Sequence, residues 1–575
     1  MRSPSACSPA AWDFSRAEEF WERFSPLSPY GKDAKEERLV LSDKAAIEAL
    51  YDGTERALAF LESRRDDPAS LDRLSYHLRR LPRLPLERRG DAAYDLVEIF
   101  QFKKFLSNYR AARLLLDEET RAWFGLGPEP AGLHAELAKG GSDAETFYVA
   151  DDYDPRLRDV RKSLARVDAA VAARRAAARA RALAECGADF GGRDFLLVPR
   201  DAAQAILKDR ALFAVEPYDA SSYIVRLQAD DEELALETER EALRQEERVL
   251  EEGVLSGLSR LVAEELPRIE GLVAAIRGFD LARARALLAV EEDLRRPLLR
   301  EAPEGRLPAL LVEGGRFLPC AWECGRLGLR YAPLDLRLAE SAAVLFGSNM
   351  GGKTVALESL VFFQVLAQAG FFTPAVRLET SVYPRIQYVG ELKARSASRS
   401  ALPAGGRGYV SEGLSGFGFE IRAFAEAWEE AGEGAFLVFD EFARTTSSRE
   451  AEAILSAALE ALARKPGVRA LFSTHFRGVS RLPGVRYLRV RGLDRRAACE
   501  ALGADEPLGE RIRRINRMME YGLVDDEGPG PSGSDAVAIA ALLGLDCGVV
   551  ARAEDIYAAG MAGSDTTRKA WTGKA

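Results

Sequence analysis

The sequence predicts a multidomain protein with an all-α core, a long-helix clamp or lever, and then an α/β domain. Apolar residues recur every three or four positions through most of 17–117, which is the period of an amphipathic helix. A long charged stretch, 230–294, keeps the same period, with a simple interaction coiled coil as the alternative to a clamp or lever. Beyond about residue 307, short β-branched segments alternate with helical ones, a pattern typical of an α/β domain.

The expected divisions follow these changes of period. Pro82 and Pro85 interrupt the early helices, GRDFLLVPR and SSYIVRLQ within 192–229 indicate a small β element, and the long helix is expected to break near Gly278. In chain order we expect a disordered N-terminus (1–16), the first part of the helical core (17–160), the clamp or lever helices with the β element (161–300), the α/β domain (301–560) and a flexible tail (561–575).

Composition excludes several classes of protein. Lys and Arg number 80 against 90 Asp and Glu, so the net charge of −10 argues against a generally basic nucleic-acid coat. The arginine-rich helical run near 160–186 is interpreted as a solvated face. The six cysteines are scattered, and Cys320 and Cys324, the close pair, lack enough neighbouring ligands for a metal site. Without a signal peptide or an apolar span, we expect a cytoplasmic protein with no membrane contact.

A glycine-rich loop follows the strand AAVLF and precedes a helix, and it fits the pattern G-x-x-x-x-G-K-[ST] in full. The backbone N–H groups of such a loop bind phosphates. Lys353 is placed to reach the β- and γ-phosphates and Thr354 to bind Mg²⁺. The loop therefore predicts nucleotide binding, with ATP or GTP, through Gly347, Ser348, Asn349, Met350, Gly351, Gly352, Lys353 and Thr354.

Two further strands end in polar residues. GAFLVFDE ends in Asp440, a candidate Mg²⁺ ligand, and Glu441, a candidate general base for the attacking water. ALFSTHF ends in His475, which is predicted to contact the γ-phosphate or that water, because this edge of an α/β sheet faces the nucleotide. A purely structural histidine is the alternative. Ser415 and Gly416 precede another helix, and such a turn is an anion site.

Taken together, these motifs resemble the MutS family of ABC-class ATPases. GSNMGGKT resembles its Gly-Pro-Asn-Met-Gly-Gly-Lys-Ser loop, with Ser348 in place of proline. DEFARTTSS, SGFGFE and STHF resemble three other family motifs. The resemblance implies ATP and Mg²⁺ as ligands and a homodimer through the ATPase domains, in which Ser415 and Gly416 reach the partner's γ-phosphate. It also places Tyr331 against adenine.

The resemblance leaves the target open between two functions. DNA binding, to duplex or branched forms, is implied by the family, but the DNA-reading N-terminal domain has no counterpart here and the clamp segment is short. The layout, FSPLSPYGKDAK (24–35) and HLRRLPRL (77–84) resemble a branch proposed to reactivate adenosylcobalamin-dependent lysine 5,6-aminomutase, which implies a protein client. The acidic charge favours that alternative. A purely structural scaffold is disfavoured by Lys353, Asp440, Glu441 and His475.

Overall fold

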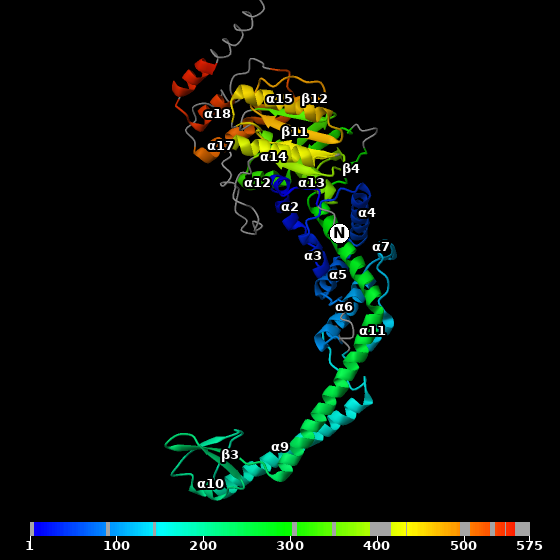
Figure 1. Ribbon diagram of the computed structural model, residues 1–575, viewed down its shortest axis with the longest axis vertical. Helices are drawn as coiled ribbons and strands as arrows, with labels where there is room; N and C mark the ends of the chain where they lie inside the picture. Colours follow the sequence, from blue (N-terminus) through cyan, green and yellow to red (C-terminus); the bar gives the residue numbers. More distant parts are fainter. Residues whose placement is uncertain are drawn as a thin grey trace, which may run out of the picture. The chain divides into compact units, whose positions relative to one another are not determined.

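The chain forms two compact units in the computed structural model (Figure 1). One unit contains residues 67–276, and the other joins the N-terminal 66 residues to everything from 277 onward. This division differs from the predicted boundaries at 160 and 300, because the first helices pack on the α/β part. The structure describes residues 5–87, 93–141, 145–301, 307–347, 352–390, 416–432, 434–444, 446–494, 507–528, 535–546 and 548–557.

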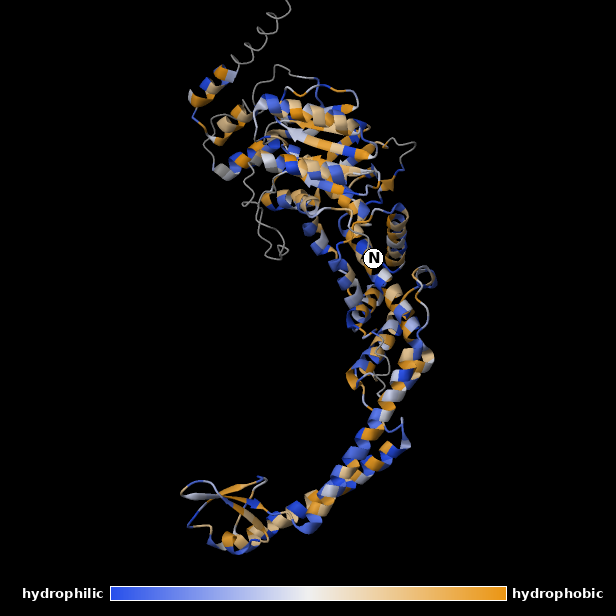
Figure 2. Cartoon of the chain, in the orientation of Figure 1, coloured by the Kyte–Doolittle hydropathy of each residue, from blue (hydrophilic) through white to orange (hydrophobic). Residues whose placement is uncertain are grey.

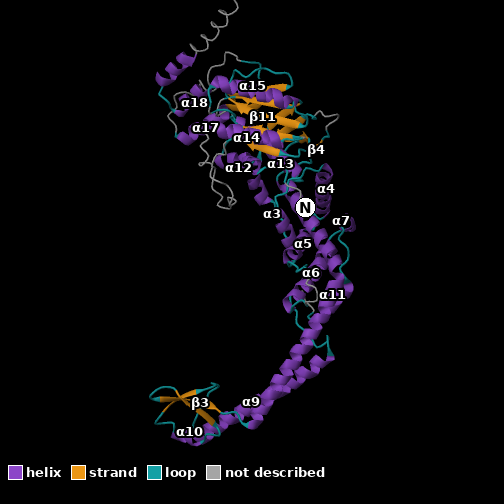
Figure 3. Cartoon of the chain, in the orientation of Figure 1, coloured by secondary structure: helices purple, strands orange, loops and turns teal. Residues whose placement is uncertain are grey.

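The unit of residues 67–276 is mainly helical (Figure 3). Several helices begin at side-chain caps: Asp67 accepts from the Ser70 N–H, and Asp95 and Glu98 form a reciprocal capping box. These caps satisfy N–H groups that the first turn leaves without partners. The helices are α5 (Pro68–Arg80), α6 (Leu96–Leu115), α7 (Glu118–Trp123), α8 (Ala131–Ala138), α9 (Pro155–Cys186) and most of α11 (Asp231–Glu291).

A three-stranded antiparallel sheet joins α9 to α11. Its order is β1-β3-β2, and it encloses a small core of its own in which Phe190 and Phe213 are buried. The sheet lies within residues 192–229, where the sequence predicted a small β element. Its elements are β1 (Leu196–Pro199), α10 (Gln204–Lys208), β2 (Phe213–Pro217) and β3 (Ser222–Leu227).

Helix α11 does not break where the sequence suggested. It runs for 61 residues through both Pro267 and Gly278. Ile276 and Phe279, on either side of Gly278, are fully buried. Burial of these side chains outweighs the helix penalty of one glycine, which is about 1 kcal/mol. The expected break near Gly278 is therefore wrong.

The second unit contains a six-stranded sheet of order β13-β12-β7-β11-β10-β9, parallel except for β13. Its central strands are mainly apolar (Figure 2), although β11 also carries Arg469, Ser473 and Thr474. Helix α13 packs on one face and α14 and α15 on the other. The strands are β7 (Ala342–Phe346), β9 (Ile386–Val389), β10 (Ala435–Phe439), β11 (Val468–Thr474), β12 (Val485–Leu493) and β13 (Met519–Asp525).

Helices and a smaller sheet surround this layer. The smaller sheet has the order β4-β8-β5-β6, with strands β4 (Leu298–Leu299), β5 (Leu310–Gly315), β6 (Leu334–Leu338) and β8 (Arg377–Thr380). The helices are α1 (Pro9–Phe14), α2 (Ala17–Arg23), α3 (Pro29–Glu36), α4 (Lys44–Ser63), α12 (Leu318–Leu327), α13 (Lys353–Gln368), α14 (Gly416–Glu430), α15 (Ser448–Arg464), α17 (Leu508–Met518) and α18 (Asp535–Leu543). Within the described ranges, none of the helices is both long and apolar enough to cross a membrane.

The N-terminus is ordered from residue 5, so the expected disorder over 1–16 is wrong for the described part. Cys7 forms a parallel bridge with Ile386 at the edge of the main sheet. Phe14 stacks on Tyr388 with 3.9 Å between ring centroids, and Trp12 is buried in the same core. Burying such aromatic surface offsets the entropy of ordering a short segment.

Candidate functional site

The glycine-rich loop connects β7 to α13 at the carboxyl edge of the main sheet. Gly352 has φ +89°, a left-handed conformation that suits glycine, and Lys353 begins the helix. Lys353 is only 3 % exposed, and its Nζ donates to the Gly347 carbonyl at 2.7 Å. The lysine therefore ties the end of the loop to its start. Ser348, Asn349, Met350 and Gly351 lie outside the described residues.

Thr354 and Asp440 meet across the sheet edge, although they come from separate elements. Thr354 Oγ1 lies 3.1 Å and 3.4 Å from the two carboxylate oxygens of Asp440 and donates to them. Their strands, β7 and β10, both flank β11 and run parallel to it. Parallel strands bring their carboxyl ends to one edge, so a residue after each strand reaches the same place.

Ser473, on β11, lies between the two acidic residues. Its hydroxyl donates to Asp440 Oδ1 and accepts from the backbone N–H of Glu441 at 2.9 Å. Glu441 has φ +54°, and Ala443 has φ +62°, both left-handed and unusual for residues with a side chain. Such conformations cost about 1–3 kcal/mol each and need support from their surroundings. Arg444 contacts the Glu441 carboxylate at 3.4 Å.

His475 follows β11 at the same edge. It is exposed, and its ring lies against Phe476 with 4.2 Å between centroids. Thr474 Oγ1 accepts from the Phe476 N–H at 3.1 Å, which shapes the turn after the strand. Gly416 begins α14, whereas Ser415 lies outside the described residues.

Tyr331 is half-buried, and its hydroxyl accepts from the Phe317 N–H at 2.6 Å. Burial raises the pKa of this phenol. Tyr331 thus bonds to the residue before α12 and packs against the apolar core of its unit.

Tyr521, on β13, lies beside Gly352 of the loop, a contact that the sequence motifs did not predict. A Cβ added to Gly352 would lie 3.2 Å from Tyr521 Cδ1. Asn516 Nδ2 donates to the Tyr521 hydroxyl at 3.1 Å, and Asn516 Oδ1 accepts from the Arg330 N–H at 2.8 Å. Asn516 therefore links Tyr521 to the residue that precedes Tyr331. No motif in the sequence marks this contact.

Comparison with known proteins gives the family of this domain. Residues 343–558 match the family described as MutS domain V. Residues 343–558 thus form a MutS-type domain V. The family prediction made from the loop and strand-end motifs is thus confirmed.

The MutS relatives that match this chain share about 30 % of its residues or fewer in the matched part, and they are much longer proteins. The DNA mismatch repair protein MutS of Sorangium cellulosum (strain So ce56) is 30 % identical over 334 residues, which cover 57 % of this chain and 32 % of the relative. The protein of the same name from Solibacter usitatus (strain Ellin6076) is 27 % identical over 327 residues, 55 % of this chain and 33 % of the relative. The chain therefore spans about a third of the length of the curated relatives it matches.

Proposed function

We propose that this chain is an ATPase in which ATP binding and hydrolysis drive a dimeric clamp or switch cycle. The observation that carries the proposal is the gathering of Lys353, Thr354, Asp440 and Glu441 at one edge of the parallel sheet. Phosphoryl transfer depends chiefly on positioning and charge stabilisation, and these residue types supply both. The membership of residues 343–558 in MutS domain V supports the assignment.

The residues have distinct proposed roles. Lys353 neutralises the β- and γ-phosphates, while the loop Gly347–Thr354 donates its backbone N–H groups. Thr354 Oγ1 and the Asp440 carboxylate form a set of hard oxygen ligands that fits Mg²⁺. When bound, Mg²⁺ offsets the charge of the phosphates. Glu441 accepts the proton of the attacking water, and His475 contacts that water or the γ-phosphate.

The base of the nucleotide is proposed to lie among aromatic side chains. Tyr331 is the family-implied partner of adenine. Tyr521 supports this placement, because its ring borders Gly352 and it is linked through Asn516 to the Tyr331 segment. Aromatic faces stack on bases with little dependence on base identity, so adenine over guanine rests on the family.

The site is proposed to be completed by a second copy. Gly416, which begins α14, and Ser415, which precedes it in the sequence, would contact the γ-phosphate held by the partner subunit. ATP then binds the closed dimer more tightly than the open one, which is the condition for a ligand to drive a conformational change. Movement of the long helices α9 and α11 would transmit that change to the target.

The proposed target is duplex or branched DNA. The test is the steady-state ATPase rate of the purified chain at near-physiological salt, without DNA and with duplex, mismatched and branched DNA. We expect one of these forms to raise the rate, with an affinity that falls steeply as salt increases.

A protein client is the second candidate, because the net charge of −10 disfavours a broad DNA-binding surface. Intact hydrolysis that no DNA form changes would contradict the DNA proposal and favour this alternative. The next addition to the assay would then be an inactivated adenosylcobalamin-dependent aminomutase.

A further inference from the structure

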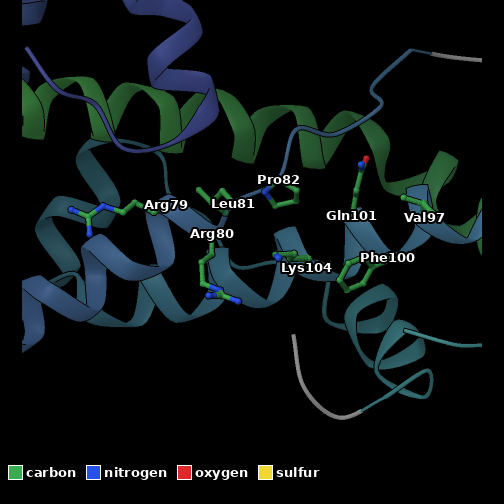
Figure 4. A pocket seen from close by; sticks show the side chains of 8 residues that line it. All are labelled: Arg79, Arg80, Leu81, Pro82, Val97, Phe100, Gln101 and Lys104. Carbon is green, nitrogen blue, oxygen red and sulfur yellow. The ribbon is translucent and has the colours of Figure 1, made fainter. Parts of the chain in front are cut away.

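A hollow lies on the helical unit, where α5 ends and α6 begins (Figure 4). Its volume is about 530 Å³, within the range of ligand-binding clefts. Arg79, Arg80 and Pro82 line it from the end of α5, and Val97, Phe100 and Lys104 line it from α6. None of these residues has a role in the proposed nucleotide site.

The hollow carries more positive than negative charge. Arg80 and Lys104 share one carboxylate, that of Glu145, at 2.7 Å and 2.9 Å. The hydrogen bond from Arg80, followed by that from Lys104, lowers the pKa of Glu145 to about 2. Arg79 is exposed and has no ion pair among the described residues. Glu145 thus pairs with two of the three cations that line the hollow.

The hollow also offers apolar surface. Val97 is 61 % exposed, although valine is a residue type that is commonly buried. Phe100 and Pro82 lie beside it. Exposed apolar surface rimmed by charged groups is characteristic of interaction sites. An occupant therefore needs both carboxylates and apolar side chains.

We propose that this hollow docks an acidic segment of a partner protein, through carboxylates on Arg79, Arg80 and Lys104 and an apolar side chain on Val97 and Phe100. In this account Glu145 occupies one carboxylate position and competes with the partner. The charge and the apolar surface together favour a peptide over a nucleic acid. Nucleic-acid binding draws on rows of cations along a backbone, whereas the described lining residues include three cations, and one acid already engages two of these.

The test is fluorescence anisotropy with the full chain and a labelled 12-residue peptide of Asp, Glu, Leu and Phe. We expect saturable binding that Arg79→Glu weakens at least about tenfold, because it replaces an attraction with a repulsion. Glu145→Gln should strengthen binding by roughly threefold or more, because it releases two cations. Arg73→Glu, a charge reversal at another exposed position of α5 outside the hollow, should leave the affinity unchanged.

Two results would overturn the proposal. One is peptide binding that is absent or that Arg79→Glu and Arg73→Glu affect equally. The other is a labelled DNA oligonucleotide that binds more tightly than the peptide and loses affinity on Arg79→Glu, which would assign the hollow to nucleic acid. Arg79→Glu should weaken peptide binding, whereas Glu145→Gln should strengthen it. Misfolding can only weaken binding, so it cannot produce both effects. The assay needs no nucleotide, so it is independent of the proposed ATPase.

Discussion

The hydroxyl of Ser473 accepts a hydrogen bond from the backbone N–H of Glu441 at 2.9 Å. The same hydroxyl donates to Asp440, so one side chain on β11 connects the proposed Mg²⁺ ligand to the proposed base. Glu441 needs such support, since its φ of +54° is strained for a residue with a side chain. Ser473 is therefore a positioning residue in this account.

Ser473→Ala should lower kcat for ATP hydrolysis about fivefold, the equivalent of one hydrogen bond of roughly 1 kcal/mol. The KM for ATP should change little, because the Ser473 hydroxyl bonds to Asp440 and Glu441, whose proposed roles are Mg²⁺ binding and proton transfer. Ser473→Thr keeps the hydroxyl and should retain most of the rate. Steady-state kinetics of the three proteins provide the measurement. An alanine variant with the wild-type kcat would remove the positioning role.

Asp440→Asn should weaken the binding of Mg²⁺, because an amide replaces a charged oxygen ligand. The Mg²⁺ concentration for half-maximal hydrolysis should rise at least about tenfold. Titration of Mg²⁺ at fixed ATP measures it, and chelation should abolish hydrolysis. Glu460→Gln removes an exposed carboxylate of α15 and serves as the matched control. Equal Mg²⁺ requirements in the two variants would argue against Asp440 as a ligand.

Tyr521→Ala should raise the KM for ATP roughly tenfold, within the range of the lost stacking of one aromatic ring on a base. Tyr521→Phe should keep most of the affinity, because it retains the ring beside Gly352 and loses only the bond from Asn516. Tyr331→Ala, measured in parallel, tests the family-implied contact. If the Tyr521 variants bind ATP like the wild type, the ring only packs against the loop.

Glu145 should stabilise the helical unit in a pH-dependent way. Its folded-state pKa is lowered from 4.5 to about 2, so its contribution is present above pH 4.5 and is lost as the pH falls towards 2. The side chain is 41 % exposed, so screening limits the contribution to no more than about 1 kcal/mol.

Glu145→Gln should therefore lower the free energy of unfolding at pH 7 and low salt. The difference from the wild type should shrink as the pH approaches 3 and as salt is added. Urea denaturation across pH 7 to 3 gives the comparison. Glu264→Gln, another exposed position in this unit, is the control. A difference that grows on acidification would show that the ion pairs with Arg80 and Lys104 are not its cause.

The meeting of Thr354 and Asp440 could be predicted because each follows an apolar strand, and parallel strands end at one edge. The part played by Ser473 could not, since it depends on β11 lying between β7 and β10 in space. Tyr521 was missed for a similar reason: it reaches Gly352 from the distant strand β13, and no local pattern encodes that contact.

The fold shows the same limit. The sequence period predicted a helix over most of α11. That the helix continues through Gly278 depends on the burial of Ile276 and Phe279. The N-terminal segment is ordered because Phe14 stacks on Tyr388, which is distant in the sequence. The local hydrophobic period of a sequence predicts helices and strands. The unbroken helix α11 and the ordered N-terminal segment depend instead on tertiary packing.

The most direct test of the proposed ATPase is the comparison of the wild type with Glu441→Gln in steady-state ATP hydrolysis and in equilibrium ATP binding. If Glu441 is the general base, hydrolysis should fall at least about a hundredfold while ATP binding persists and the ATP-bound dimer accumulates. Hydrolysis at the wild-type rate by Glu441→Gln would contradict the account, because the catalytic step would then not depend on this site.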